Sequence, residues 1–326
     1  MSQALQDGKL LAESQITCWR EFGHDMLLVE NGVVAEAGAC GCEVEFYDDG
    51  PPRVSDHILS DRNGGLKRVA DLEIPDPWKT PPMSTVLEAV KILRKEVGEY
   101  IFIMGRADQG PGALALALRG YERFLLDLAL MEQPDEIHAV LDFCVRVQVR
   151  YATALREAGA HGTAIGGLGI SLLNPRLYRH FEHPYEKKVI REVNRSDFPV
   201  ALHICGDATS ILQDMVSTGA PILELDYKTS LPDARRELRD KAAFLGPINP
   251  ELLWGTRETG EITSKSREAI EILAPGGGFI LGPGCALAYN TPSENIHALV
   301  EAAHRYGIYN SDGSIKNQPN ESREIL

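Results

Sequence analysis

The residues best suited to metal chemistry stand in the segment VALHICGD, which covers Val200–Asp207. His203 and Cys205 are two residues apart, and a strand places such residues on one face with their Cβ atoms about 6–7 Å apart. Zinc takes nitrogen at about 2.0 Å and sulfur at about 2.3 Å, so both side chains could reach one ion. A buried core histidine beside a buried thiol would give the same pattern and is the alternative to metal binding.

A third ligand is offered by Cys285, which lies in the segment GFILGPGCALAYNTP. The residues before it, Gly282, Pro283 and Gly284, suit a tight turn that presents the thiol at the end of a strand. Three protein ligands leave one coordination position open, as in catalytic zinc sites. We therefore predict that His203, Cys205 and Cys285 hold a catalytic zinc ion.

These ligands must be positioned by a chain that alternates short β-rich runs with longer helical patterns. The predicted strands are Asp25–Glu30, Tyr100–Gly105, Thr163–Gly167, Val200–Ile204, Ile222–Asp226, Ala242–Leu245 and Gly278–Leu281. The predicted helices are Ser84–Val97, Gly120–Ala129, Pro134–Ala158, Pro175–Asn194, Thr209–Ser217, Ser264–Leu273 and Pro292–Tyr306. This alternation indicates a parallel sheet with helices outside it.

Two stretches depart from the alternation. Residues 35–79 are rich in glycine and proline and carry short alternating pieces, so we expect an inserted excursion with a small hairpin. Residues 310–326 are polar, and we expect a poorly ordered tail after a single domain that covers residues 1–309. The chemically interesting residues follow the predicted strands, which favours a (β/α)8 barrel over an open doubly wound sheet.

Composition limits the classes of partner. The 326 residues are 44% hydrophobic and 25% charged, which is ordinary for a soluble globular protein, and the net charge is −14. That charge argues against nucleic acids and against an anionic membrane surface. No apolar run reaches the roughly 18 residues that a spanning helix needs, and the start has no signal pattern, so we expect a cytoplasmic protein with free cysteines.

The chain resembles the uroporphyrinogen decarboxylase superfamily, and within it the zinc branch of methylcobalamin:coenzyme M methyltransferases. That branch is known by His-x-Cys at the end of the fifth barrel strand and a distant cysteine after the eighth, which correspond to His203, Cys205 and Cys285. The resemblance spans about residues 19–309 and includes the segments FLLDLALMEQPDEIHAVLD, NPRLYRHFEHPYEKKV, LELDYKTSLPDARREL, LGPINPELL and APGGGFILGPGCALAYNTPSENIHALVEAA.

The resemblance implies a (β/α)8 TIM barrel with a zinc site at its mouth and a separate corrinoid (cobalamin) protein that presents its cobalt there. The chain itself lacks the D-x-H-x-x-G corrinoid motif, so the corrinoid would belong to a partner. The first barrel strand of the family has no counterpart, and we expect a barrel shortened at the N-terminus. The sequence leaves the oligomeric state open, a homodimer included.

Six further residues are candidates for the site. The resemblance implies an acidic residue near the zinc, which is Asp226 at the end of the predicted Ile222–Asp226 strand, with Glu224 on the same face as a weaker candidate. Substrate-binding candidates are Arg106 and Asp108, predicted to follow the Tyr100–Gly105 strand, together with Asn249 and Tyr289. The alternatives are a buried acid that pairs with neighbouring groups, an internal Arg106–Asp108 ion pair, and a turn or capping role for Asn249.

The predicted function is a zinc-dependent methyltransferase. It would move a methyl group between a corrinoid protein and a small molecule, either a thiol acceptor or a methoxy- or methylamine-type donor. A uroporphyrinogen decarboxylase-like lyase is the alternative within enzymes, but the arginine-rich start (RQAGRY-like) that grips the porphyrinogen carboxylates is absent from this sequence. A non-catalytic partner protein that handles zinc or corrinoid is the third hypothesis.

Overall fold

The computed structural model describes residues 2–316, apart from the side chains of Asp108 and Gln109. The chain divides into two compact units. Unit 1 comprises residues 1–205 and 210–222, and unit 2 comprises residues 206–209 and 223–326. The expectation of a single domain therefore stays a prediction.

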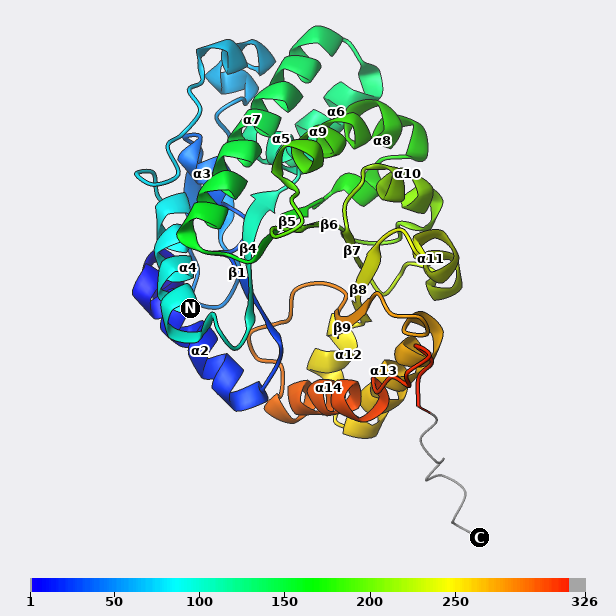
Figure 1. Ribbon diagram of the computed structural model, residues 1–326. Coiled ribbons are helices and arrows are strands. Elements are labelled where there is room, and N and C mark those ends of the chain that lie inside the picture. Colours follow the sequence, from blue (N-terminus) through cyan, green and yellow to red (C-terminus); the bar gives the residue numbers. More distant parts are fainter. Residues whose placement is uncertain (1, 317–326) are drawn as a thin grey trace. The chain divides into compact units, whose positions relative to one another are not determined.

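Unit 1 contains a row of parallel strands in the order β1-β4-β5-β6. The strands are β1 (Met26–Val29), β4 (Phe102–Gln109), β5 (Gly162–Gly166) and β6 (Val200–Ile204), shown in Figure 1. Its helices are α1 (Ser2–Gln6), α2 (Gly8–Phe22), α3 (Ala35–Ala39), α4 (Met83–Val97), α5 (Pro111–Arg119), α6 (Tyr121–Leu130), α7 (Pro134–Ala158), α8 (Pro175–Phe181), α9 (His183–Val193) and α10 (Leu212–Ser217). Every residue of β5 and β6 is buried, as expected for parallel strands that are covered on both faces.

Unit 2 continues the same alternation of strand and helix. It contains β7 (Ile222–Leu225), whose first residue belongs to unit 1, followed by β8 (Ala243–Ile248) and β9 (Phe279–Pro283). β8 and β9 pair in parallel over five residues. Its helices are α11 (Leu231–Leu238), α12 (Pro250–Gly255), α13 (Thr259–Leu273) and α14 (Ser293–Tyr306).

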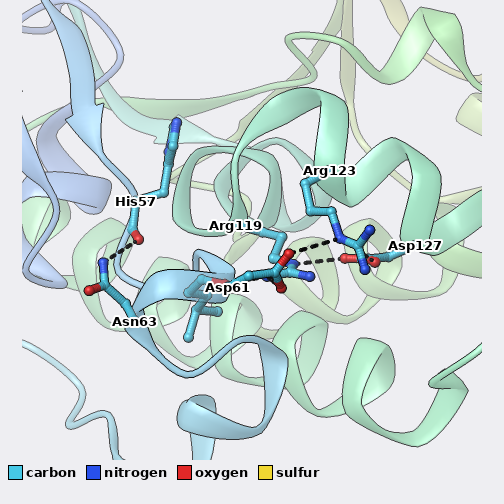
Figure 2. A network of polar contacts seen from close by, with 7 residues as sticks. His57, Asp61, Asn63, Arg119, Arg123 and Asp127 are labelled. Carbon is cyan, nitrogen blue, oxygen red and sulfur yellow. Dashed lines mark hydrogen bonds and ion pairs between the residues drawn. The ribbon is translucent and has the colours of Figure 1, made fainter.

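The predicted hairpin in the excursion at 35–79 is confirmed. β2 (Glu43–Glu45) and β3 (Arg53–Asp56) pair antiparallel. The segment that follows is fixed to the rest of unit 1 by Arg119, at the end of α5 and only 2% exposed. Its guanidinium contacts Asp61 at 2.7 Å and Asp127 at 2.8 Å (Figure 2). It also donates to the carbonyl oxygen of Leu59 at 2.8 Å.

The structure departs from the predicted elements in three places. The single helix expected at Pro175–Asn194 breaks at Glu182 into α8 and α9, because Pro184 in the first turn of α9 has no amide hydrogen to continue the first helix. β4 extends to Gln109, so Arg106 and Asp108 lie in the strand and not after it. The α5 helix was missed because all nine of its residues are buried, which leaves no amphipathic period to detect.

The first residues of the tail expected after residue 309 make local backbone contacts. Asn310 donates its backbone amide to Ser314, and Tyr309 forms a bridge with Ile315. Residues 317–326 of the expected tail lie outside the described residues. Among residues 2–316, no helix is long and apolar enough to cross a membrane.

Candidate metal centre

The carboxyl end of β6 in unit 1 carries the first two predicted ligands. His203 is the fourth residue of the strand and is 3% exposed, and Cys205 follows the last residue and is half-buried. The two side chains point to the same side of the chain, as their two-residue spacing predicts. His203 Nε2 and Cys205 Sγ lie 3.0 Å apart.

This separation is close to what one metal ion requires. Tetrahedral zinc with its usual bond lengths holds a nitrogen and a sulfur ligand about 3.6 Å apart. The two donor atoms at 3.0 Å would need to separate by only about half an ångström. The pair therefore fits a zinc ion, and the donor types, an imidazole nitrogen and a thiol sulfur, are those that zinc prefers.

The backbone around this pair is tightly packed. A Cβ on Gly167, which follows β5, would lie 3.0 Å from the carbonyl oxygen of His203. Gly206, directly after Cys205, has φ +87°, a left-handed conformation that glycine adopts readily. The chain thus turns sharply after Cys205 and leaves the thiol at the end of the strand.

Cys285, the third predicted ligand, lies in unit 2 and is half-buried. It follows β9 and Gly284, whose backbone amide donates to the carbonyl oxygen of Ile248 at 2.8 Å. A Cβ on Gly284 would lie 2.8 Å from the backbone nitrogen of Tyr227, so only glycine fits there. As predicted, a glycine-rich turn places the thiol at the end of a strand.

Asp226, the predicted acidic residue, is 6% exposed and directly follows β7. Its Oδ2 accepts from the backbone amide of Gly206 at 2.9 Å, and its Oδ1 accepts from that of Lys228 at 3.1 Å. Glu224, two residues earlier on the same face, is also 6% exposed. The bonds of Asp226 match the alternative of a buried acid that pairs with groups of a neighbouring segment.

The predicted substrate-binding residues lie in varied surroundings. Arg106 in β4 is buried, and it pairs with Glu30, directly after β1, at 3.3 Å. Asn249 caps α12, because its side chain accepts from the backbone amide of Glu251 at 2.9 Å. Tyr289 is 68% exposed. The side chain of Asp108 lies outside the described residues, so the proposed Arg106–Asp108 ion pair stays untested.

The remaining cysteine pair of the excursion behaves differently from Cys205 and Cys285. Cys40 and Cys42 are buried, and the Sγ of Cys42 donates to the carbonyl oxygen of Ala117 at 3.8 Å. Burial raises the pKa of Cys42 to about 11 and that of Cys40 well above its ordinary value. These thiols stay protonated near neutral pH and act as small buried hydrophobic groups.

Sequence reasoning did not single out Thr229, which contacts the backbone that follows Cys205. Thr229 is buried and bonds to the backbone of Gly206 and Ala208, and nothing in the spacing of a lone threonine indicates this. It also missed Glu182 and Glu186, two buried acids of unit 1. They occur in the segment EHPYE, which resembles an ordinary polar helix start.

Comparisons with known proteins agree with this architecture. Two curated relatives are named methylcobamide:CoM methyltransferase. MtbA of Methanosarcina mazei is 31% identical over 292 residues, covering 87% of this chain and 81% of that protein. MtaA of Methanosarcina barkeri is 33% identical over 308 residues, covering 93% of this chain and 86% of that protein.

A solved structure gives the same result for the fold. A methyltransferase from Methanosarcina mazei superposes with a TM-score of 0.83 at 27% identity, covering 92% of this chain and 86% of that chain. The predicted barrel class of the superfamily is thereby confirmed. The uroporphyrinogen decarboxylase (URO-D) family model matches residues 1–306 of the 326. The chain is therefore a member of the uroporphyrinogen decarboxylase family.

Proposed function

We propose that this protein is a corrinoid-linked methyltransferase that uses zinc held by His203, Cys205 and Cys285. The observation that carries the proposal is the pair at the end of β6, whose nitrogen and sulfur lie 3.0 Å apart. Each of the three residues offers one ligand atom of a type that zinc prefers. The relatives named methylcobamide:CoM methyltransferase support the same class of reaction.

Bound zinc would act as a Lewis acid that lowers the pKa of a substrate thiol and so supplies a thiolate at neutral pH. The chain's own ligands suit this role, because two thiolates and one neutral imidazole balance the charge of the ion. A substrate thiolate then carries the excess negative charge that favours attack on a methyl group. The buried ring of His203 is held by its strand, which limits the reorganisation needed during the reaction.

The acidic and polar candidates belong to the same proposal. Asp226 would act through its hold on Gly206, and Glu224 would add a second carboxylate beside it on β7. Arg106 would bind an anionic group of the small substrate in competition with Glu30. Asp108, Asn249 and Tyr289 remain proposed substrate contacts.

The methyl group would pass between a separate corrinoid protein and a small molecule. A thiol acceptor is the leading substrate, and a methoxy- or methylamine-type donor is the alternative. The two are distinguished by direction. Methylcobalamin with a thiol should yield the S-methyl product, whereas a methyl donor with reduced cob(I)alamin should yield methylcobalamin.

The proposal is tested with protein purified without chelator. About one zinc per chain is expected, together with S-methylation of a thiol by methylcobalamin that is followed by mass spectrometry. Cys285→Ala should lose both the zinc and the activity. The matched control is Cys144→Ala, which removes a buried thiol from α7 and should keep both.

The other hypotheses give different results in the same experiment. A lyase of the decarboxylase type would consume uroporphyrinogen without any corrinoid. A non-catalytic partner protein would retain zinc with four protein ligands and transfer no methyl group. Wild-type protein without zinc, or Cys285→Ala with full activity, would contradict the methyltransferase proposal.

A further inference from the structure

The turn after β7 and the four residues after Cys205 are joined by several hydrogen bonds, all within unit 2. Asp226 accepts from the backbone amide of Gly206. Ser230 donates its backbone amide to the hydroxyl of Thr209 at 3.0 Å. Residues 206–209 are thus attached at both ends to residues 226–230.

Thr229 occupies the centre of this arrangement. Its hydroxyl donates to the carbonyl oxygen of Gly206 at 3.4 Å and accepts from the backbone amide of Ala208 at 3.2 Å. Its own amide donates to the carbonyl oxygen of Asp226 at 3.0 Å, which closes the turn. The side chain is 2% exposed, so water cannot readily replace its hydroxyl.

The same turn also contacts the segment that carries Cys285. A Cβ on Gly284 would lie 2.8 Å from the backbone nitrogen of Tyr227 and 3.2 Å from the Cα of Asp226. One rigid turn therefore borders the residue after Cys205 and the residue before Cys285. Any looseness in this turn would reach the backbone next to each thiol.

We propose that Thr229 is a positioning residue for the two cysteine ligands, an inference that rests on the proposed zinc site. Its hydroxyl fixes the backbone that follows Cys205 and keeps the turn rigid against Gly284. Residues that orient metal ligands without contacting the metal typically contribute 10–100-fold to metal affinity. Removal of the hydroxyl should therefore speed zinc release without removing any ligand.

The experiment compares three variants of the full chain. Thr229→Val removes the hydroxyl at nearly constant volume, and Thr229→Ser retains it. Thr218→Val is the matched control. Thr218 is also buried, and its hydroxyl likewise joins two backbone groups, donating to the carbonyl oxygen of Met215 at 2.6 Å and accepting from the amide of Ala220 at 3.3 Å. It stands before β7, at the other end of that strand.

Zinc release is followed as transfer to a chromophoric chelator. Thr229→Val should release zinc roughly 10-fold faster than wild type, whereas Thr229→Ser and Thr218→Val should release it at the wild-type rate. Equal rates for Thr229→Val and wild type would overturn the inference. Equal acceleration in both valine variants would also overturn it, because that result reports a general loss of stability.

Amide hydrogen exchange separates this inference from the proposed function. If wild-type protein holds no zinc, the zinc proposal fails. The positioning role is then decided in the metal-free protein. Exchange at the amides of Gly206 and Ala208 should rise several-fold in Thr229→Val and stay unchanged in Thr218→Val. Unchanged exchange at those amides in Thr229→Val would overturn the role of Thr229.

Discussion

The carboxylate of Asp226 accepts a hydrogen bond from the backbone amide of Gly206, the residue after Cys205, at 2.9 Å. Its second oxygen accepts from the amide of Lys228. The acid thus satisfies two backbone donors at the end of β7. We expect such a residue to contribute to stability as well as to the site.

Asp226→Ala should lower the free energy of unfolding by about 2 kcal/mol, because two backbone amides in a mostly buried setting lose their acceptor. Asp226→Asn keeps one carbonyl oxygen and should lose less. Urea unfolding measures both, and the exposed Asp49→Ala serves as the control within about 0.5 kcal/mol of wild type. Equal stability of Asp226→Ala and wild type would argue against a stabilising role for the bonds of Asp226 to the amides of Gly206 and Lys228.

The cysteines should differ in their reactivity toward iodoacetamide. Cys205 and Cys285 should be protected while zinc is bound and become modified after chelation. Cys18 is exposed and should react in both states, whereas Cys40 and Cys144 should react in neither, because burial raises the pKa of each thiol well above its ordinary value. Peptide mass spectrometry measures the labelling of each cysteine. Equal labelling of Cys205 with and without the chelator would count against metal binding.

Two buried acids of unit 1 predict a dependence of stability on pH. Burial raises the pKa of Glu186 to about 7, and burial together with repulsion from Glu186 raises that of Glu182 well above its ordinary value. The folded state therefore binds protons more tightly than the unfolded state, whose glutamates titrate near 4.5. Stability should be lost as the pH rises from about 4.5 through 7.

Glu186→Gln replaces one of the two titrating carboxyl groups by a neutral amide. The amide oxygen remains an acceptor for the hydroxyl of Tyr178, which donates to Glu186 at 2.6 Å. The variant should exceed wild type by roughly 2–3 kcal/mol at pH 8 and by much less at pH 5. Urea unfolding at several pH values checks this, with the exposed Glu192→Gln as a control that shows no such trend. A stability difference independent of pH would refute the assignment.

The two acidic residues that contact Arg119 differ in burial, so breaking the two contacts should cost very different amounts of unfolding free energy. Arg119→Met removes the buried guanidinium partner of Asp127, which keeps only the half-exposed Arg123 at 3.2 Å, and should cost about 3 kcal/mol of unfolding free energy. Asp61→Asn removes a partner whose side chain is 67% exposed and should cost less than about 1 kcal/mol. Figure 2 shows both acids around the arginine. Similar losses for the two variants in urea unfolding would contradict the account.

Much of the fold was predictable from the sequence. β6 matches its prediction residue for residue, and so does α7. β6 is a short, mostly apolar run of the length of a buried strand, and α7 is a long amphipathic helix with a strong period. The break at Glu182 and the fully buried α5 were missed. A proline inside a helical pattern allows either a kink or a stop, and a helix that is buried all round has no polar face.

The proximity of the first two proposed ligands was predictable. His203 lies in β6 and Cys205 directly follows it, so their two-residue spacing along an extended chain already places the side chains close together. The supporting contacts of Asp226 and Thr229 join segments about 20 residues apart in the sequence, and only the packed backbone reveals them. The same holds for Arg106, whose partner Glu30 stands 76 residues earlier.

The central claim is a zinc ion with three protein ligands and one exchangeable position. X-ray absorption at the zinc edge tests it directly, on protein purified without chelator, before and after addition of a thiol. We expect about one zinc per chain, with one nitrogen and two sulfur ligands from the protein, and a third sulfur after the thiol is added. Absence of zinc, or a shell of four protein ligands that the thiol leaves unchanged, would contradict it.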